Sequence, residues 1–174
     1  MKPNVTPTNQ EIVMDDNDFI VSKTDLKGRI TYANRIFMSI AGYAEHELLN
    51  VQHNIIRHPD MPRGVFRLLW NVIESGQECF AYVKNMAKNG DYYWVFANVT
   101  VDHDHKGQPT GYFSVRRKPS RTGIDAIVPV YQEMLAIERQ AGTRDAPNAS
   151  LNWLVDLLKS KGTTYEEFIH TLGH

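Results

Sequence analysis

The chain has 174 residues, of which 42% are hydrophobic and 22% are charged. This composition is typical of a globular protein and argues against a disordered or fibrous one, and the length suits one domain with an accessory element. Lysine and arginine number 19 against 20 aspartate and glutamate residues, so no overall positive field favours nucleic acid or anionic lipid as a partner.

The expected location is the cytoplasm. The first residues, MKPNVTPTNQ, lack the apolar core of a signal peptide, and no stretch approaches the ~20 apolar residues that cross a bilayer. The single cysteine, Cys79, excludes an intramolecular disulfide and a thiolate zinc cluster, as expected in a reducing compartment. We expect Cys79 to be a half-buried packing residue.

The front of the chain predicts a cap followed by a hairpin. Residues 1–18 are polar and acidic and predict an N-terminal tail or cap. Two β-favouring runs, 19–22 and 29–32, then flank a turn in which Gly28 can adopt a positive φ.

Helices are predicted next. Asn34 is a candidate N-cap for a short helix that ends at Gly42, and residues 45–49 predict one further helical turn. A longer helix ending near Gly76 is predicted by apolar residues at helical spacing, namely Val65, Leu68, Leu69, Val72 and Ile73.

Three antiparallel strands are predicted in residues 80–119. The first two strands are joined at Asn89-Gly90, a strong short hairpin signal, and the last two by a turn around Lys106-Gly107. Two strands, several helices and three strands predict an α+β domain, in which helices cover one face of a single sheet.

Past Pro119 the composition changes to helix formers. Pro129 is expected to kink the first helix of this region or to delay its start, and residues 142–147 predict a break. The apolar face of that first helix is predicted to contain Ile124, Ile127, Val128, Tyr131, Leu135 and Glu138.

The last residues predict a helical hairpin over 148–172. Ser150 is the expected cap of its first helix, and Gly162 is the expected end. Thr163 and Glu166 have the spacing of a capping box for its second helix.

Several motifs give the chain a resemblance to PAS domains. TDLKGRITYANRIFMSIAGYAEHELL resembles the front half of these sensor domains, and KNGDYYWVFANV with GYFSVRRK resembles their last strands. A more particular motif is HNIIRHPDMP, with Trp70 eight residues beyond Pro62 and Asn85 further on. This combination closely resembles the flavin-binding PAS domains of bacterial aerotaxis receptors, which hold FAD noncovalently and report cellular redox state.

The resemblance implies a PAS fold over residues 19–118. It implies a five-stranded antiparallel sheet with short helices on one face. Residues 119–174 are then expected to form a C-terminal helical extension. A cytoplasmic redox or oxygen sensor is the implied function, as in aerotaxis.

The chemistry of RHPDMP supports a dinucleotide site. Pro59 and Pro62 restrict the backbone, so charged side chains project from a stiff loop. Arg57 can bind phosphate, while His58 and Asp60 can hydrogen-bond a ligand or hold Arg57 in place. Without the resemblance, an Arg beside an Asp is more often a surface ion pair than a ligand site.

By the resemblance, four residues are the predicted FAD ligands and two are secondary candidates. The four are Arg57, His58, Asp60 and Asn85; an amide such as that of Asn85 suits the pyrimidine edge of a flavin. The secondary candidates are Trp70, which can form a wall for the ring or simply belong to the core, and Asn34.

The expected chemistry is electron transfer. Light-sensing PAS domains need a cysteine in a motif similar to NCRFLQ, and the corresponding NIIRHPDMP has none. Reduction is expected to change hydrogen bonds at the ring edge, with the change passing through the sheet to flanking elements. The expected partners are a second copy of the chain or a separate signalling protein, such as a chemotaxis or kinase-type transducer.

The sequence also leaves other functions open. A haem-binding gas sensor with His53 or His58 as axial ligand is one alternative, and a cofactor-free interaction module is another. No nucleophile elbow or phosphate loop is present, so no enzymatic activity is expected. The triplet His103-Asp104-His105 predicts a solvated turn and not a metal site.

Overall fold

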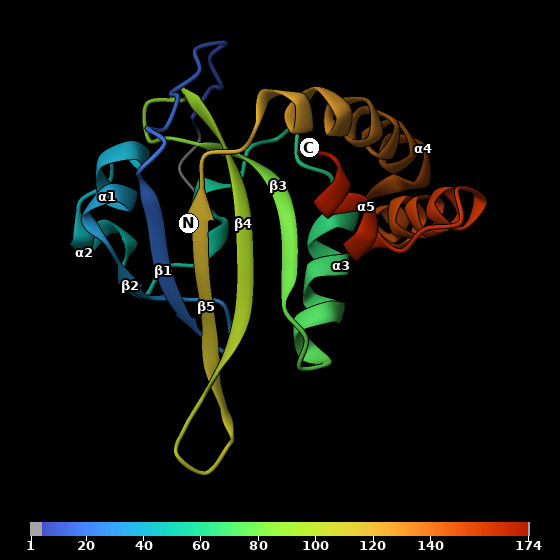
Figure 1. Ribbon diagram of the computed structural model, residues 1–174. Coiled ribbons are helices and arrows are strands. Elements are labelled where there is room, and N and C mark those ends of the chain that lie inside the picture. Colours follow the sequence, from blue (N-terminus) through green and yellow to red (C-terminus); the bar gives the residue numbers. More distant parts are fainter. Residues whose placement is uncertain (1–4, 174) are drawn as a thin grey trace.

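A five-stranded antiparallel sheet organises the molecule, with strand order β2-β1-β5-β4-β3. The computed structural model describes residues 5–173. The strands are β1 (Phe19–Asp25), β2 (Ile30–Ala33), β3 (Cys79–Met86), β4 (Tyr92–His103) and β5 (Pro109–Arg117). The helices are α1 (Arg35–Ala41), α2 (Glu45–Leu48), the 3-10 turn η1 (His53–Ile56), α3 (Arg63–Glu74), α4 (Arg121–Ser160) and α5 (Tyr165–Thr171), as Figure 1 shows.

Local signals in the first half predicted these elements correctly. Gly28 has a φ of 76° in the turn between β1 and β2. The Asn34 side chain accepts from the backbone N–H of Phe37 and caps α1, which ends at Gly42 in the left-handed conformation. The predicted long helix is α3.

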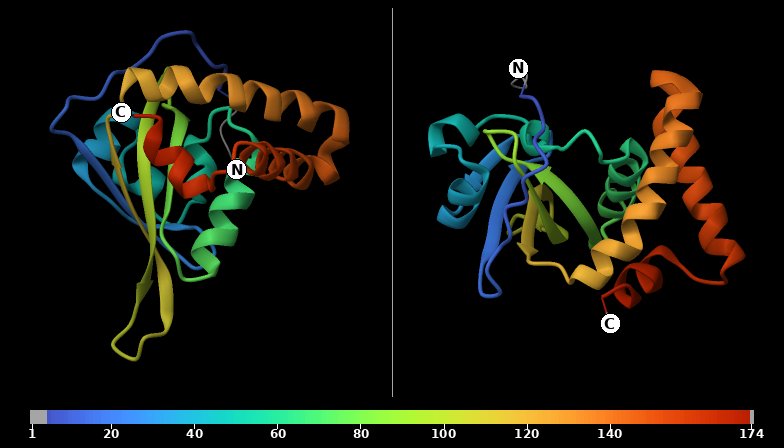
Figure 2. Two further views of the ribbon diagram at one scale, coloured as in Figure 1. Left: turned by 45° about the vertical axis from the view of Figure 1, so that its right-hand side comes forward. Right: turned by 90° about the horizontal axis from the view of Figure 1, so that it is seen from above.

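The helices lie on one face of the sheet and along the edge formed by β3. Side chains alternate between faces along each strand, so Ser22, Ser114, Arg116 and Ala97, which are paired across β1, β5 and β4, share one face. Helices α1 to α3 and η1 lie on that side, while α5 packs on β3 and α4 runs beside β3 and contacts α3 (Figures 1 and 2).

Aromatic side chains join the C-terminal helices to the outer face of the sheet. The hydroxyl group of Tyr131 on α4 donates to the backbone oxygen of Tyr82 at 2.7 Å. The His170 ring on α5 meets the Phe80 ring edge-on, with centroids 4.5 Å apart. The C-terminal helices therefore pack on their own domain.

The break in the C-terminal region is sharper than the sequence predicted. Helix α4 starts at Arg121, capped by Ser120, and it continues through Pro129, so the expected delay of its start is wrong. The packed apolar face formed by Ile124, Ile127 and Tyr131 offsets the hydrogen bond that proline removes. The chain leaves helical geometry only at Gly142, with φ 76° and ψ 166°.

Two predicted caps are also wrong, the first of them because the chain turns back at Gly142 and is helical again before Ser150 (Figure 2). Ser150 lies inside the second half of α4, fully buried, and its hydroxyl donates to Glu138 Oε1 at 2.6 Å. The hairpin predicted over 148–172 is present, since the second half of α4 ends at Ser160 and α5 follows after Gly162, which has a φ of 67°. The two halves of α4 form a further hairpin around Gly142. The capping box of α5 is formed one residue later than predicted, by Thr164 and Glu167. Within residues 5–173, no helix has both the length and the apolar character that crossing a membrane requires.

Residues 5–18 form a cap on the sheet, and residues 1–4 of the predicted tail or cap lie outside the described residues. The backbone N–H of Thr8 donates to the carbonyl oxygen of Gly90, and that of Ile12 donates to Tyr92. Met14 is buried in the core. Glu11 also pairs with Arg121 at 3.0 Å, so this segment contacts the start of α4.

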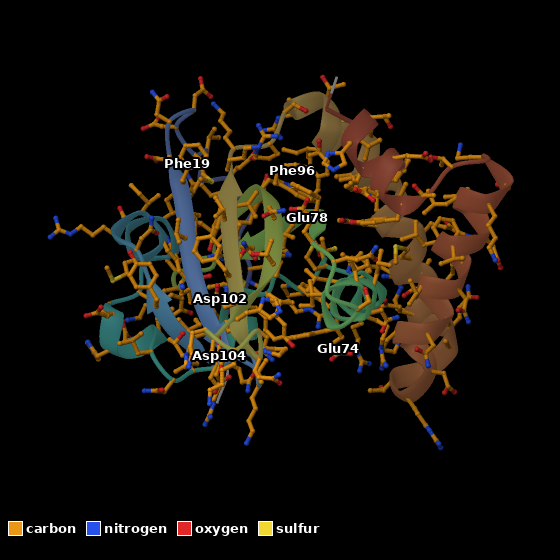
Figure 3. The ribbon with its side chains drawn as sticks, turned by 60° about the horizontal axis from the view of Figure 1, so that its bottom comes forward. Phe19, Glu74, Glu78, Phe96, Asp102 and Asp104 are labelled. Carbon is orange, nitrogen blue, oxygen red and sulfur yellow. The ribbon has the colours of Figure 1, made fainter. Side chains whose placement is uncertain are left out.

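The triplet His103-Asp104-His105 lies at the turn between β4 and β5, as predicted. Asp104 Oδ1 accepts from the backbone N–H groups of Lys106 and Gln108, at 2.8 and 2.9 Å. Figure 3 shows Asp102 and Asp104 near one end of the sheet and Phe19 and Phe96 near the other. Cys79, expected to be half-buried, is only 3% exposed, and burial raises the pKa of its thiol to about 12.

We predict that Gly64→Ala destabilises the contact between α3 and α4. A β-carbon at position 64 would lie 2.1 Å from Ser150 Oγ and 2.9 Å from the backbone nitrogen of Leu151. Overpacking of this kind costs about 1–3 kcal/mol of unfolding free energy, measurable by urea denaturation. Asn71→Ala, an exposed change on the same helix, is the control and should shift stability by less than about 0.5 kcal/mol. Equal stability of the two variants would contradict this packing.

Candidate functional site

A cavity of about 270 Å³ lies between the inner face of the sheet and helix α3. Strands β1, β3, β4 and β5, turn η1 and α3 all contribute side chains to it. The apolar lining consists of Ile56, Phe66, Leu69, Trp70, Ile73, Val83, Ala97 and Val99. The remaining lining residues are Ser22, Thr24, Gly28, Gln52, His53, Asn54, Arg57, Asn85, Tyr112, Ser114 and Arg116.

A second hollow, of about 330 Å³, opens beside the first. Arg57, Phe66 and Trp70 line both. The second hollow adds Arg63 and Arg67 from the first turns of α3 and one acidic residue, Glu74, from its end, so arginines outnumber carboxylates in its lining. An apolar chamber therefore adjoins a cationic one, and Arg57 lies at their boundary.

The RHPDMP loop brings Arg57 to Asn85. Their backbones form an isolated antiparallel bridge, which joins the loop to β3. Arg57 stacks on the Phe66 ring at 4.4 Å, and its Nη2 donates to the carbonyl oxygen of Met61 at 3.1 Å. Burial lowers the pKa of Arg57, and nearby Arg63 lowers it further while Glu138 opposes the shift. Both predicted residues line the cavity.

His58 and Asp60 face away from the cavity and brace the loop. The Nδ1 atom of His58 accepts from the backbone N–H of Asp60 at 3.0 Å. The Asp60 carboxylate pairs with Lys84 on β3 at 2.6 Å. Neither residue is part of the cavity lining. The Asp60–Lys84 pair joins the loop to β3, and the roles predicted for the two residues toward a ligand or Arg57 stay predictions.

Trp70 forms a wall, whereas Asn34 lies elsewhere. The Trp70 ring meets the Tyr112 ring edge-on, with centroids 5.1 Å apart, and it faces both hollows. The Asn34 side chain accepts from the backbone N–H groups of Val21 and Phe37 and donates to the carbonyl oxygen of Phe19. Its three hydrogen bonds serve the backbone, and it does not line the cavity.

Sequence reasoning missed Arg116 as a site residue. This side chain is 3% exposed, and it lines the cavity from β5. Its Nη2 donates to Ser22 Oγ at 2.5 Å, and its Nη1 lies 3.2 Å from His53 Nε2. Burial lowers the pKa of Arg116 to about 10, so the group stays charged at neutral pH. The alternation in GYFSVRR would have placed it on the same face as Tyr112 and Ser114.

His53 lines the cavity as a neutral ring. Burial, with a smaller effect of nearby Arg116, lowers its pKa to about 3. Neutral Nε2 can accept hydrogen bonds, and it lies 3.1 Å from Ser22 Oγ and 3.2 Å from Arg116 Nη1. His53, weighed above as a haem ligand, therefore belongs to a hydrogen-bond network with Ser22 and Arg116.

We predict that His53 makes the protein less stable in acid. Its folded pKa lies below the ~6.5 of an unfolded histidine, so below that pH only the unfolded chain binds this proton. The free energy of unfolding should therefore fall between about pH 7 and about pH 5, and it should fall less in His53→Gln. Urea denaturation at both pH values measures this. His46→Gln, at an exposed site on α2, is the control. An identical pH dependence in all three proteins would contradict the prediction.

Comparison with known proteins agrees with this architecture. A family model for the PAS fold matches residues 30–116. The chain is 39% identical over 129 residues to the aerotaxis receptor of Escherichia coli K12. This match covers 74% of the chain and 25% of the receptor. It is 28% identical over 97 residues to a nitrogen fixation regulatory protein of Klebsiella pneumoniae, covering 56% of this chain and 20% of the regulator. The chain thus spans about a quarter of the aerotaxis receptor and less of the regulator.

A solved structure gives the same fold. A light-oxygen-voltage domain, studied with a flavin analogue, superposes with a TM-score of 0.56 and 22% identity. The match covers 66% of this chain and 86% of that domain.

Proposed function

The chain belongs to the PAS family, and we propose that it is a redox sensor that binds FAD noncovalently between the sheet and α3. The observation that carries the proposal is the joining of an apolar chamber to a cationic one, with Arg57 at their boundary. A flavin dinucleotide has the matching parts, a flat ring system and a diphosphate. The similarity to the aerotaxis receptor supports the same assignment.

The apolar chamber fits a flavin ring in its chemistry. Trp70, Leu69 and Ile73 on α3 face Val83 and Val99 on the sheet, so aliphatic and aromatic surfaces stand on two sides. Asn85 supplies a side-chain amide, which can both donate to and accept from the pyrimidine edge. When bound, the flavin would supply reversible electron uptake, while these walls exclude water and Asn85 orients the ring.

The cationic chamber favours FAD over FMN. Arg57, Arg63 and Arg67 all line the second hollow, and guanidinium groups bind phosphate oxygens in pairs of hydrogen bonds. A diphosphate offers them more oxygens than a single phosphate does. Arg63 is also positioned by a bond from Nη1 to the carbonyl oxygen of Thr143, at 2.6 Å.

An adduct photocycle is not part of the proposal. The only thiol, that of Cys79, is buried with Ile73 and Val99 in a small apolar cluster at the start of β3. Its raised pKa keeps it protonated and therefore poorly nucleophilic. Electron uptake is the chemistry that remains for a flavin here.

Output is proposed to pass through the C-terminal helices to a partner protein, which is a second copy of the chain or a separate transducer. Helix α3 forms one cavity wall and also contacts α4. Buried Glu138 on α4 accepts from the backbone N–H of Gly64 at 2.9 Å and from Ser150 Oγ at 2.6 Å. A change in the α3 wall would therefore reach both halves of α4 through one carboxylate.

Flavin binding and its selectivity are tested together. We predict that the wild-type protein binds FAD more tightly than FMN, measured by quenching of flavin fluorescence. Arg67→Ala should weaken FAD binding about tenfold and FMN binding less, since it removes one charge-assisted hydrogen bond. Arg57→Ala should weaken the binding of both flavins by more than Arg67→Ala does. Circular dichroism checks that the variants fold.

The control is Arg35→Ala, an exposed arginine on α1. It should bind both flavins like the wild type. Wild-type protein that binds no flavin would reject the sensor proposal. Equal effects of Arg67→Ala on FAD and FMN would reject only the dinucleotide assignment.

The Glu138 connection is tested by amide hydrogen exchange in oxidised and reduced protein. We predict that reduction changes exchange within residues 121–171, and that Glu138→Leu diminishes this change while FAD stays bound. Glu138→Gln is the matched control because its amide oxygen can still accept from Gly64 and Ser150. An undiminished response in Glu138→Leu would show that the signal leaves by another route.

A further inference from the structure

Arg116 is a buried cation at the inner wall of the cavity. It is 3% exposed and lies opposite Ala97 of β4 and Ile20 of β1 in the sheet register. Ser22 and His53 fix its two terminal nitrogens, and its guanidinium group lies 4.6 Å from the centre of the Phe37 ring. These contacts hold the positive charge in one place.

The surroundings of this cation do not neutralise it. The ionisable groups that face it are His53, which is neutral, and Tyr93, whose pKa is raised by burial. Among residues 5–173, no carboxylate pairs with Arg116, and its Nε has no hydrogen-bond partner. Thr24 Oγ1, in the same cavity lining, likewise has no partner within this described part of the chain. A buried charge without a counter-charge is costly, so the cavity is suited to a ligand that supplies negative charge.

We propose that Arg116 is the residue that balances the negative charge of the flavin ring after reduction. This inference rests on the proposed function. Arg116 acts on the ring and not on the phosphates because it lines only the apolar chamber, whereas the cationic chamber has Arg57, Arg63 and Arg67. Phosphates carry their charge in both redox states, but a flavin ring gains charge only on reduction.

Reduction of the ring would consume two electrons and one proton. An external two-electron reductant, dithionite in the test, delivers two electrons to the neutral oxidised ring. One proton from solvent binds at ring N5, and the ring keeps one negative charge. In free flavin in mild acid, N1 takes a second proton and the reduced ring is neutral. Arg116 favours the anion, so that second proton stays in solvent.

The test is the pH dependence of the midpoint potential of the FAD-loaded full chain. Wild-type protein should take up one proton for each two electrons in mild acid, where free FAD takes up two. Arg116→Met should take up two protons. It should also lose about tenfold in its preference for reduced over oxidised FAD, which corresponds to a potential lower by about 30 mV.

Two further variants separate charge from packing. Arg116→Lys keeps the charge and should keep the wild-type proton count. Arg117→Met removes the same charge from the same strand, but residue 117 is exposed on the opposite face and stacks on Phe96, so its proton count should be unchanged. If Arg116→Met does not fold, a count of two protons in the wild-type protein still overturns the inference.

The outcomes distinguish this inference from the proposed function. A wild-type protein that binds FAD but takes up two protons would overturn the role of Arg116 and leave the sensor assignment intact. One proton in both wild type and Arg116→Met would also overturn it. Failure of the wild-type protein to bind FAD would overturn both.

Discussion

Attachment of the RHPDMP loop to β3 is the constraint on which the site depends. The Arg57–Asn85 bridge and the Asp60–Lys84 ion pair join this loop to the strand, and helix α3 starts immediately afterwards. The helix is thereby fixed at one end beside the sheet, with a cavity between them. The prolines at 59 and 62 limit the backbone conformations of the loop, which lowers the entropy lost in making these contacts.

The charges of the site are distributed by depth. Arg57, Arg63 and Arg67 border the second hollow, where part of their surface is solvated. Arg116 is buried on the inner face of the sheet. A cation in a low-dielectric setting interacts more strongly with a nearby charge than an exposed one does. Under the proposed function, the exposed cations would bind the phosphates and the buried cation would respond to the charge of the ring.

The two faces of the sheet have different neighbours. The inner face lines the cavity, and the outer face of β3 and β4 is covered by α4 and α5 through aromatic contacts with Phe80, Tyr82 and Phe96. Glu138 adds a second connection, from α3 directly to both halves of α4. The C-terminal helices are thus in contact with the cavity walls from two directions, which suits them to report a change inside the cavity.

The sequence by itself determined the local elements and the family. Asn34 as a cap, Gly28 and Gly42 as left-handed positions, the spacing of α3 and the Asn89-Gly90 turn are all decided by backbone geometry within a few residues. The motifs also identified the residues that meet at the cavity wall, Arg57, Asn85 and Trp70.

Only the tertiary structure decided which polar side chains face the cavity. His58 and Asp60 are close to Arg57 in sequence, yet they do not line the cavity. Asp60 instead forms an ion pair with Lys84 on β3. Arg116 is held at the cavity by Ser22 on β1 and His53 on η1. Ser150 contacts Glu138 because the chain reverses its direction at Gly142. Alternation along a strand is a local property, but burial and pairing depend on segments distant in sequence, so no local pattern specifies them.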